Sequence, residues 1–544
     1  MNLKKIESDF TTTDDGKCTT STRGMISTQS AEATDAGLAM LRAGGNAIDA
    51  AVAAAFTLCV TESQASGLGG QTMMLIANED DVVAIDGSSR APSLAHSSAI
   101  YKRDRAVGYR AATVPSTPAA LGYVHRCYGR LSWEAVLEPA IHHAREGYTV
   151  TDLQERLLGR EKSRFEEVSS QSGLKYFFRD GLPYETGEVF KQPELGDLLA
   201  RLAERGFEEF YRGKTAKQID ADMRQNGGLL RYDDLALIPY PIVRQSLVRP
   251  YRGLDVHTMP PPGSGRSLLF MLTMIDMIPR EKQIDDQATR YLLFVRLLRK
   301  ALLERSDRPF DPNFFPQISG DADMLDPAYC RECLAEILED VDRSILPFIP
   351  SRDEVSGETT HLSVIDADGA AVSLTQSIER VYGSKAAAQG LGFLYNNYLY
   401  DFEYELPEHP FYLRPNAVPW ATVSPTLVFH QGRVWMAVGS PGSERVISTL
   451  ALFLHRVADY DMSIDEAMRT PRIHCSLGGR VSLEVGRFAE SLGPFFEHKG
   501  FRVDPREDYS FYLGCVQAVL RRADGGGFQG VADIRRPGTA RGLD

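Results

Sequence analysis

A stretch of small and apolar residues constrains the fold of this chain more than any other feature: AIDAAVAAAFTLCV, residues 47–60. It predicts a helix that is apolar on nearly every side, and such a helix has to be buried. Its alanines would let a neighbouring sheet or helix approach closely. Another helix is expected just before it, because Ser30 can cap its start, Gly44-Gly45 can end it, and Asn46 can cap the apolar helix in turn.

The apolar helix is followed by SGLGG at residues 66–70. Three glycines in five residues predict a turn with unusual dihedral angles, or a close contact with a ligand. A dinucleotide-binding loop is a poor match, because the glycine spacing differs and the run follows a helix instead of a strand.

Helical and strand-like stretches alternate along the rest of the chain. MLIANEDDVVAID, residues 74–86, predicts a hairpin, and helices are expected within 131–223 and over 287–305. After Gly357, TTHLSVID and AAVSLTQS flank an Asp368-Gly369 turn, and SPTLVFHQGRVWMAVGS predicts a further hairpin. Helices are expected near 444–458 and 463–469. This order predicts an α+β or layered α/β/β/α architecture.

The composition limits the class of protein. With 544 residues, 43% of them hydrophobic and 24% charged, the chain can bury a large core, which excludes collagen-like, disordered and coiled-coil folds. A net charge of −13 argues against nucleic acid as the main partner. Seven cysteines favour a reducing compartment. Cys330 and Cys333 form a lone C-x-x-C, and because a zinc site needs four ligands we expect no metal.

The first 23 residues are rich in Thr, Ser and Asp and predict a mobile N-terminal arm. They include no apolar core of a signal peptide, and no stretch of the chain approaches 18 uninterrupted apolar residues. We therefore expect a soluble cytoplasmic protein with no membrane partner.

Residue patterns alone leave the chemistry open. The chain has no G-x-S-x-G elbow, no P-loop and no H-E-x-x-H motif. His361 lies beside Ser363 on an expected strand, a pattern typical of a half-buried strand residue. A Thr-Thr pair at the start of a strand is also common and does not by itself indicate a catalytic site.

A set of longer motifs is more specific, and it arrives in one order from about residue 24 to about residue 538. The N-terminal motifs are SAEATDAGLAMLRAGGNAIDAAVAAAFTLCVTES, SGLGG, DGSSRAP, GRLSWEAVLEPAIHHAREGYTV, YDDLALIPYPIVRQSLVRPYRGLDVHTMPPPGSG and DPNFF. The C-terminal motifs are ETTHLSVIDADGAAVSLTQS, LYNNYLYDF, TVSPTLVF and GSPGSERV. Together they strongly resemble the γ-glutamyltranspeptidase family.

The resemblance implies the four-layer αββα sandwich of the N-terminal-nucleophile hydrolases, an α+β fold. It also implies a precursor that cuts itself between Glu358 and Thr359. After the arm at 1–23, residues 24–358 would form the large subunit and 359–544 the small subunit. The two cleaved chains would associate as one intertwined domain.

The implied nucleophile is Thr359. A Thr hydroxyl needs a base beside it, and cleavage would free the α-amine of the same residue. An α-amine has a pKa of roughly 8, so it can accept a proton near neutral pH. One residue then supplies nucleophile and base, and no cofactor is needed.

Other positions take roles from the resemblance. Ser377 matches the hydroxyl that bonds the nucleophile and assists self-cleavage. Gly442 and Ser443 match the pair whose backbone N–H groups form the oxyanion hole. Asp401 matches the carboxylate that binds the amino group of the substrate.

The pocket for the acyl group departs from the family pattern. Ser88 occupies the position of the Arg that holds a glutamyl carboxylate, and Arg90 is two residues away. The family's Ser-Ser pair is Ala421-Thr422 here, and its Asn and Gln are Glu379 and Tyr398. With Ser88 and Arg90, these are the residues in which the pocket departs from the family.

An unpaired buried carboxylate costs several kcal/mol. This favours a self-processing amide hydrolase or acyltransferase with a non-standard acyl group, acting on a small amide or peptide-like molecule. One alternative is a true γ-glutamyl transpeptidase or glutathione hydrolase in which Arg90 replaces the missing Arg. Another is an uncut, non-catalytic binding protein.

Overall fold

The computed structural model describes residues 1–544 except 79–80, 281–285, 312, 314–323 and 341–356. The structure contains both helices and sheets, as expected, and two seven-stranded sheets form its centre. The first sheet has the order β1 (Cys18–Ser21), β18 (Phe528–Ala532), β17 (Gln517–Arg521), β13 (Arg433–Gly439), β12 (Thr426–His430), β9 (Leu254–Thr258), β8 (Leu247–Tyr251). The second has the order β19 (Thr539–Gly542), β2 (Gly24–Thr28), β10 (Thr360–Asp366), β11 (Ala371–Ser377), β3 (Gln71–Asn78), β4 (Asp81–Gly87), β7 (Ile242–Gln245).

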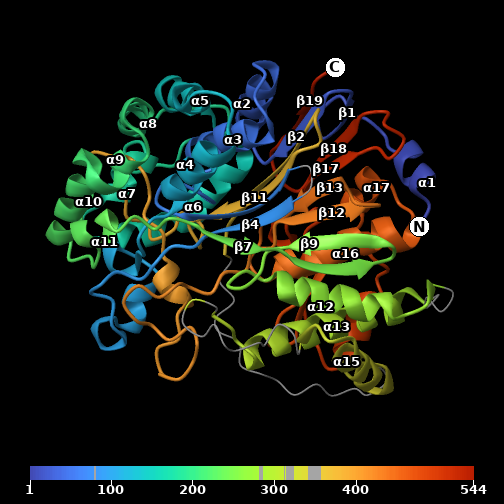
Figure 1. The fold of residues 1–544 in the computed structure, drawn as a ribbon. Coiled ribbons are helices and arrows are strands. Elements are labelled where there is room, and N and C mark those ends of the chain that lie inside the picture. Colours follow the sequence, from blue (N-terminus) through green and yellow to red (C-terminus); the bar gives the residue numbers. More distant parts are fainter. Residues whose placement is uncertain (79–80, 281–285, 312, 314–323, 341–356) are drawn as a thin grey trace.

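The two sheets pack face to face, with β10 against β13 and β17. One buried apolar cluster joins them, with Met73 and Leu75 from the second sheet and Leu427 and Val519 from the first. Helices cover the outer faces: Figure 1 shows α2–α11 beyond the second sheet and α12, α13, α15 and α16 beyond the first.

The predicted pair of N-terminal helices is confirmed. Helix α2 (Ala31–Arg42) is capped by Ser30, and α3 (Ala47–Thr61) by Asn46 in a capping box with Asp49. All fifteen residues of α3 are buried, because the helix lies between β10 and β11 on one side and the helices α2 and α5 (Trp133–Glu146) on the other. The apolar sequence of α3 is the consequence of that position.

The helices on the first sheet are shared between the two predicted subunits. Helix α12 (Gly265–Asp276) packs on β8 and β9, and α16 (Arg445–Tyr460) packs on β13 and α12. Helices α13 (Gln287–Asp307) and α15 (Pro327–Asp340) lie outside α12. Cys330 and Cys333 lie buried on α15, as two thiols on one helix.

The remaining elements surround this core. They are α4 (Thr117–Tyr128), α6 (Asp152–Glu166), α7 (Ser172–Phe177), α8 (Pro193–Arg205), α9 (Glu208–Arg212), α10 (Lys214–Gln225), α11 (Tyr232–Ala236), α17 (Ile464–Arg469), α18 (Leu492–His498), and the short strands β5 (Tyr148–Thr149), β6 (Val189–Phe190), β14 (Ile473–Cys475), β15 (Arg480–Glu484) and β16 (Arg502–Arg506). Among the described residues, no helix is both long and apolar enough to cross a bilayer.

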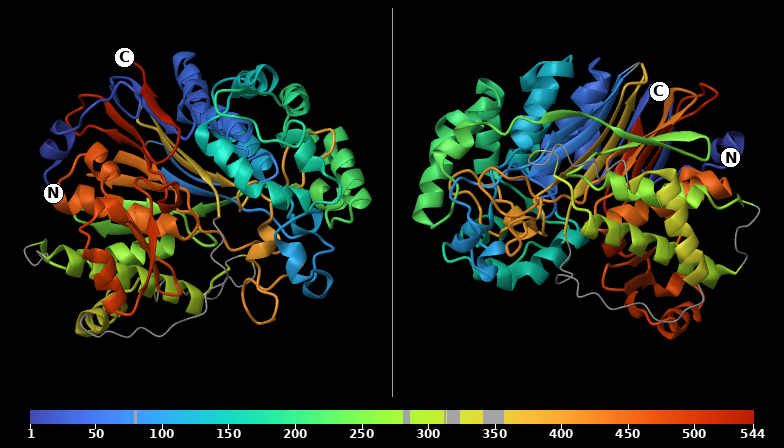
Figure 2. Two further views of the ribbon diagram at one scale, coloured as in Figure 1. Left: turned by 180° about the vertical axis from the view of Figure 1, so that it is seen from behind. Right: turned by 60° about the horizontal axis from the view of Figure 1, so that its bottom comes forward.

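The prediction of a mobile arm over residues 1–23 is wrong. Helix α1 (Leu3–Ser8) buries Ile6, and β1 pairs with β18 from Cys18↔Val531 to Ser21↔Phe528. Threonine and serine suit a strand as well as a loop, and here the partner strand lies some 500 positions away in the sequence. Both chain termini lie at this end of the sheets (Figure 2).

The hairpin after Gly357 is confirmed and occupies the middle of the second sheet. Strands β10 and β11 are antiparallel, and Thr360 pairs with Gln376. Thr359 and Ser377 are therefore the next residues at the same end of the two strands. Residues 79–80 of the first predicted hairpin and most of the DPNFF motif lie outside the described residues.

Candidate active site

Thr359 and Ser377 meet at the open end of the β10–β11 hairpin. The Thr359 hydroxyl donates to Ser377 Oγ at 3.4 Å, and the Ser377 hydroxyl donates to the carbonyl oxygen of Glu358 at 2.8 Å. The backbone N–H of Glu379 donates to the same Ser377 Oγ at 2.9 Å. The Ser377 hydroxyl thus links the predicted nucleophile to the carbonyl of the peptide bond that precedes it.

The chain is continuous across Glu358–Thr359, and the Glu358 side chain is buried. Its carboxylate accepts the N–H of Thr359 at 3.1 Å and forms an ion pair with Arg536. Burial raises the pKa of nearby Glu62 to about 8, against the charge of Arg536 and with a contribution from Glu358. The Glu358–Thr359 peptide bond therefore lies close to the ionisable groups of Glu358, Arg536 and Glu62.

The backbone of the SGLGG loop packs closely against the backbone of Ser377. A Cβ at Gly70 would lie 2.2 Å from the backbone oxygen of Ser377, and a Cβ at Gly69 would lie 2.1 Å from the oxygen of Leu394. Gly67, Gly69 and Gly70 have no positive φ, so the unusual dihedral angles that the sequence offered as one interpretation are not observed, and the close contacts are with the backbone of the protein itself. No side chain other than hydrogen fits at Gly70 while β11 keeps its place.

Gly442 and Ser443 form a tight turn after β13. Their φ angles are 123° and 53°, both in the left-handed region that favours glycine. Within the described part of the chain, neither N–H donates to a protein acceptor. A Cβ at Gly357 would lie 3.0 Å from the Ser443 Cβ, so the turn adjoins the residues before Thr359.

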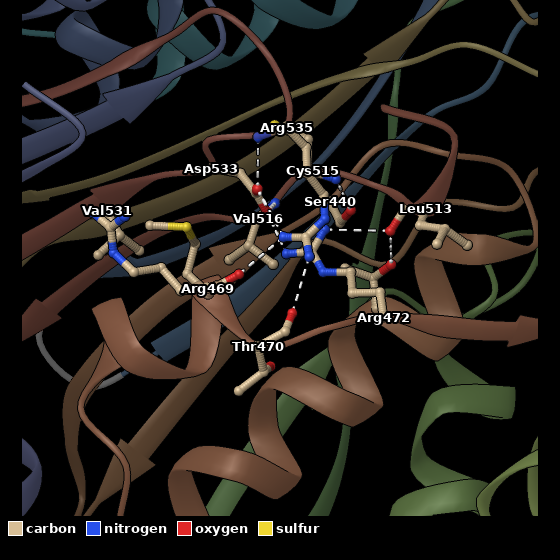
Figure 3. A network of polar contacts seen from close by, with 12 residues as sticks. Ser440, Arg469, Thr470, Arg472, Leu513, Cys515, Val516, Val531, Asp533 and Arg535 are labelled. Atoms are coloured by element: carbon tan, nitrogen blue, oxygen red, sulfur yellow. Dashed lines mark hydrogen bonds and ion pairs between the residues drawn. The ribbon is translucent and has the colours of Figure 1, made fainter. Parts of the chain in front are cut away.

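A buried network of charges holds the C-terminal segment that carries Arg536. Asp533 pairs with both Arg472 and Arg535, and Arg535 pairs with Glu484 through two hydrogen bonds of 2.6 and 2.9 Å. Figure 3 shows Asp533 between the two arginines. These charges are paired, as buried charges have to be, and they fix the chain one residue before Arg536.

The same network reaches the Gly442-Ser443 turn. Arg472 donates to the oxygen of Leu513 at 3.3 Å, and the N–H of Cys515 donates to Ser440 Oγ at 3.0 Å (Figure 3). Ser440 stands two residues before Gly442. The turn and the C-terminal segment are therefore held by one set of buried contacts.

A cavity of about 440 Å³ opens beside Thr359. Of the residues predicted from the sequence, it brings together Thr359, Ser377, Ser443, Asp401, Glu379, Tyr398 and Thr422. Ala421, Gly442 and Glu358 are not among the lining residues, and neither are Ser88 and Arg90.

Comparison with known proteins decides the family. The family model described as gamma-glutamyltranspeptidase matches residues 33–543. The chain belongs to the γ-glutamyltranspeptidase family. The glutathione hydrolase proenzyme of Escherichia coli (strain K12) is 30% identical over 526 residues, which cover 92% of this chain and 89% of the relative.

Two further proteins that are similar to this chain are named as acylases. The acylase ACY 1 proenzyme of Pseudomonas sp. (strain V22) is 30% identical over 543 residues, covering 96% of this chain and 94% of the relative. The crystal structure of a cephalosporin acylase from Bacillus halodurans superimposes with a TM-score of 0.88 at 26% identity, covering 97% of each chain. The chain is thus an enzyme of a hydrolase and transferase family.

Arg90, the residue that could replace the family's glutamyl-binding Arg, is not among the residues that line the cavity. The Ser88 hydroxyl donates to Asp86, and the backbone of Arg90 bridges to Val114. Burial lowers the pKa of Arg90, opposed by the charges of Asp86 and Asp311. The expectation that Arg90 could reach the acyl pocket is not supported by this position.

Two carboxyl groups share one side of the cavity. Burial raises the pKa of Glu379, opposed by a hydrogen bond with Asp401 and by the charge of Arg380. Glu379 also has a left-handed φ of 80°, which holds its side chain at the end of β11. A carboxyl pair in this place could hold an amino group of a substrate.

The sequence did not point to three arginines that line the cavity. Each guanidinium lies over an aromatic ring, which is a favourable cation–π geometry. The pairs and their distances from guanidinium carbon to ring centroid are Arg305 over Trp420 at 4.6 Å, Arg380 over Tyr400 at 3.5 Å and Arg445 over Tyr512 at 4.2 Å. Arg380 stands directly after Glu379, so its place beside Ser377 was the one available signal.

His361 is fully buried between the sheets, where a half-buried strand residue was expected. Its ring nitrogens contact Thr375 Oγ1 at 2.8 Å and Ser363 Oγ at 3.1 Å. Across the described residues, no group of three or more His, Cys, Asp or Glu side chains could hold a metal ion.

Proposed function

We propose that this enzyme is a self-processing, Thr-dependent amide hydrolase or acyltransferase with the four-layer αββα sandwich of the N-terminal-nucleophile hydrolases. The observation that carries the proposal is the Ser377 hydroxyl, which contacts Thr359 Oγ1 and donates to the Glu358 carbonyl. Cleavage would give chains 1–358 and 359–544, which remain one intertwined domain because β10 lies between β2 and β11.

Self-cleavage starts when the Thr359 hydroxyl attacks the Glu358 carbonyl carbon. The hydrogen bond from Ser377 polarises that carbonyl and stabilises the charge that develops on its oxygen. The C–N bond breaks, the acyl group moves to the Thr359 oxygen, and water hydrolyses the ester. The products are the carboxylate of Glu358 and the free α-amine of Thr359.

In turnover, the α-amine of Thr359 takes the proton of its own hydroxyl as the hydroxyl attacks the substrate carbonyl. The N–H groups of Gly442 and Ser443 point to no protein acceptor in the described chain, and they are suited to hold the oxyanion. The amine leaves, and water or another amine then takes the acyl group from the threonine.

The acyl group is non-standard in this proposal. Ser88 cannot supply the charge of the missing Arg, and Arg90 lies outside the cavity lining. The acylase names of two relatives are in line with an amide other than glutathione. The alternative, a γ-glutamyl transpeptidase or glutathione hydrolase like the Escherichia coli relative, draws its support from the Glu379–Asp401 pair, which could bind an amino group.

The first experiment is the intact mass of the purified protein under denaturing conditions, beside a Thr359→Ala control. We expect two chains, the smaller beginning at Thr359, and one uncut chain in the control. A single chain in both samples would favour a non-catalytic binding protein. Release of glutamate from a γ-glutamyl anilide then separates the acylase from the transpeptidase.

A further inference from the structure

Arg380 differs from the other charged groups of the cavity. Its side chain is 5% exposed and lies over the Tyr400 ring at 3.5 Å. Within the described part of the chain, its guanidinium takes part in no hydrogen bond or ion pair. Arg380 lines the cavity together with Thr359 and Ser377.

The two neighbouring arginines are already engaged. Arg305 donates to Thr422 Oγ1 and to the Ala421 oxygen, each at 3.0 Å. Arg445 donates to the oxygen of Tyr512 at 3.1 Å and to that of Gly357 at 3.4 Å. Both hold loops around the cavity in place. Among the described residues, the Arg380 guanidinium holds no loop, and its charge acts on the neighbouring carboxyl of Glu379.

The backbone of Arg380 is fixed next to the reacting atoms. Its N–H donates to Asn397 Oδ1 at 3.1 Å, and the residue bridges to Gly357, which stands two positions before Thr359. The main chain of Arg380 is therefore held on both sides, and its guanidinium lies over the Tyr400 ring. Among the described residues, the cavity therefore presents a planar cation whose N–H donors have no acceptor.

We propose that Arg380 binds a carboxylate at the far end of the acyl group, so that the substrate is a monoamide of a dicarboxylic acid. This rests on the proposed function. A guanidinium matches a carboxylate through two parallel hydrogen bonds, which makes it a specific receptor for such a group. Arg380 takes over, from another side of the pocket, the charge that is missing at Ser88.

The reaction that follows is balanced without any further reagent. The Thr359 oxygen bonds to the amide carbon, the C–N bond breaks, and the amine leaves with the proton from the Thr359 hydroxyl. Water then supplies OH to the acyl carbon and a proton to Thr359. The products are a free dicarboxylate and an amine.

The test compares nitroanilides of succinic, glutaric and adipic acid with the same compounds whose distal carboxylate is a neutral carboxamide. For the best chain length, we expect the wild type to prefer the carboxylate by about 100-fold in kcat/KM, the range of a charge-assisted hydrogen-bond pair. In Arg380→Met the preference should fall to within about threefold, because the charged substrate loses more of its kcat/KM than the neutral one. Arg380→Lys should restore part of the preference.

Arg433→Met is the matched control, because Arg433 is exposed on β13 and should leave the preference unchanged. Equal rates for charged and neutral substrates in the wild type would overturn the inference. So would an equal loss on both substrates in Arg380→Met, which would indicate a purely structural role. A γ-glutamyl anilide that outperforms every dicarboxylate and is unaffected by Arg380→Met would overturn it while the proposed function stands.

Calorimetric binding of free succinate, glutarate and adipate decides the inference separately from turnover. We expect at least one of the three to bind the wild type and to lose about 100-fold in affinity in Arg380→Met. If no anilide is hydrolysed and the chain stays uncut, the proposed function fails, and loss of dicarboxylate binding in Arg380→Met would still support a carboxylate site at Arg380. Absence of binding by all three to the wild type would overturn it.

Discussion

The hydroxyl of Ser377 donates its hydrogen to the carbonyl oxygen of Glu358 at 2.8 Å, across the end of the β10–β11 hairpin. Two other groups, the Thr359 hydroxyl and the Glu379 N–H, point at the same oxygen of Ser377. Because both of those groups donate, the single hydrogen of Ser377 is committed to the carbonyl. This arrangement polarises one peptide bond of the chain and leaves the hydroxyl of Thr359 beside it.

Ser377→Ala should slow self-cleavage by about 100-fold, the usual loss for one donor to a developing oxyanion. The reason is that the Glu358 carbonyl would lose its polarising hydrogen bond while Thr359 stays in place. The measurement is the fraction of uncut chain over time by intact mass. Ser377→Thr keeps the hydroxyl and should cleave at a rate near that of the wild type. Cleavage of Ser377→Ala at the wild-type rate would remove the serine from the mechanism.

Removal of the Arg536 charge should destabilise the uncut chain. In a Thr359→Ala background, Arg536→Met leaves the buried Glu358 carboxylate unpaired, and we expect a loss of about 3–5 kcal/mol in unfolding free energy. Urea unfolding measures it. Arg541→Met is the control, because the Arg541–Asp35 pair is exposed and should contribute less than about 1 kcal/mol.

A second substitution separates charge from packing in this pair. Glu358→Gln combined with Arg536→Met removes both charges, so it should recover most of the stability lost in Arg536→Met alone. If the double variant is as unstable as the single one, Arg536 acts through its packing and not through its ion pair with Glu358.

Local signals in the sequence were enough to predict several elements of the fold. The caps at Ser30 and Asn46 and the turn at Asp368-Gly369 depend on neighbours within a few residues, and the structure has all three. Strand β1 was missed because its partner β18 comes some 500 residues later, and nothing in a short polar segment reveals a pairing over that distance.

The site residues also fall into those that local sequence predicts and those that only distant contacts bring together. The family motifs brought Thr359 and Ser377 to attention, since both stand in one continuous hairpin sequence. The ion pair of Glu358 with Arg536 joins residues 178 positions apart, and the place of Arg380 in the cavity wall becomes visible only in the folded structure. The sequence offered Arg90 as a replacement for the missing Arg, and Arg90 is not among the residues that line the cavity.

Substitutions of Ser443 test whether the backbone N–H or the side chain of this residue contributes to catalysis. Its φ of 53° is strained for a residue with a Cβ, so Ser443→Gly should keep the N–H, retain kcat and gain up to about 1 kcal/mol of stability. Ser443→Val should lower kcat by about 100-fold, because a β-branched residue resists this conformation and displaces the donor. Steady-state kinetics on the best anilide measures both. Loss of activity in Ser443→Gly would assign the role to the hydroxyl.

His361 should make the stability of the protein sensitive to acid. Burial lowers its pKa to about 3, so the folded protein keeps the ring neutral, held by Thr375 and Ser363. The unfolded chain takes up a proton below a pKa of roughly 6.5, and the free energy of unfolding therefore falls as the pH drops from there toward the folded value.

Between about pH 7.5 and about pH 5 this single group should remove about 2 kcal/mol of stability. His361→Gln, in the uncut Thr359→Ala background, should lose about 2 kcal/mol less than its parent over the same interval, whatever its absolute stability. Denaturant unfolding at the two pH values measures the difference. His498→Gln is the control at an exposed position and should follow the parent. An identical pH dependence in His361→Gln and the parent would mean that the folded protein accommodates a charged His361.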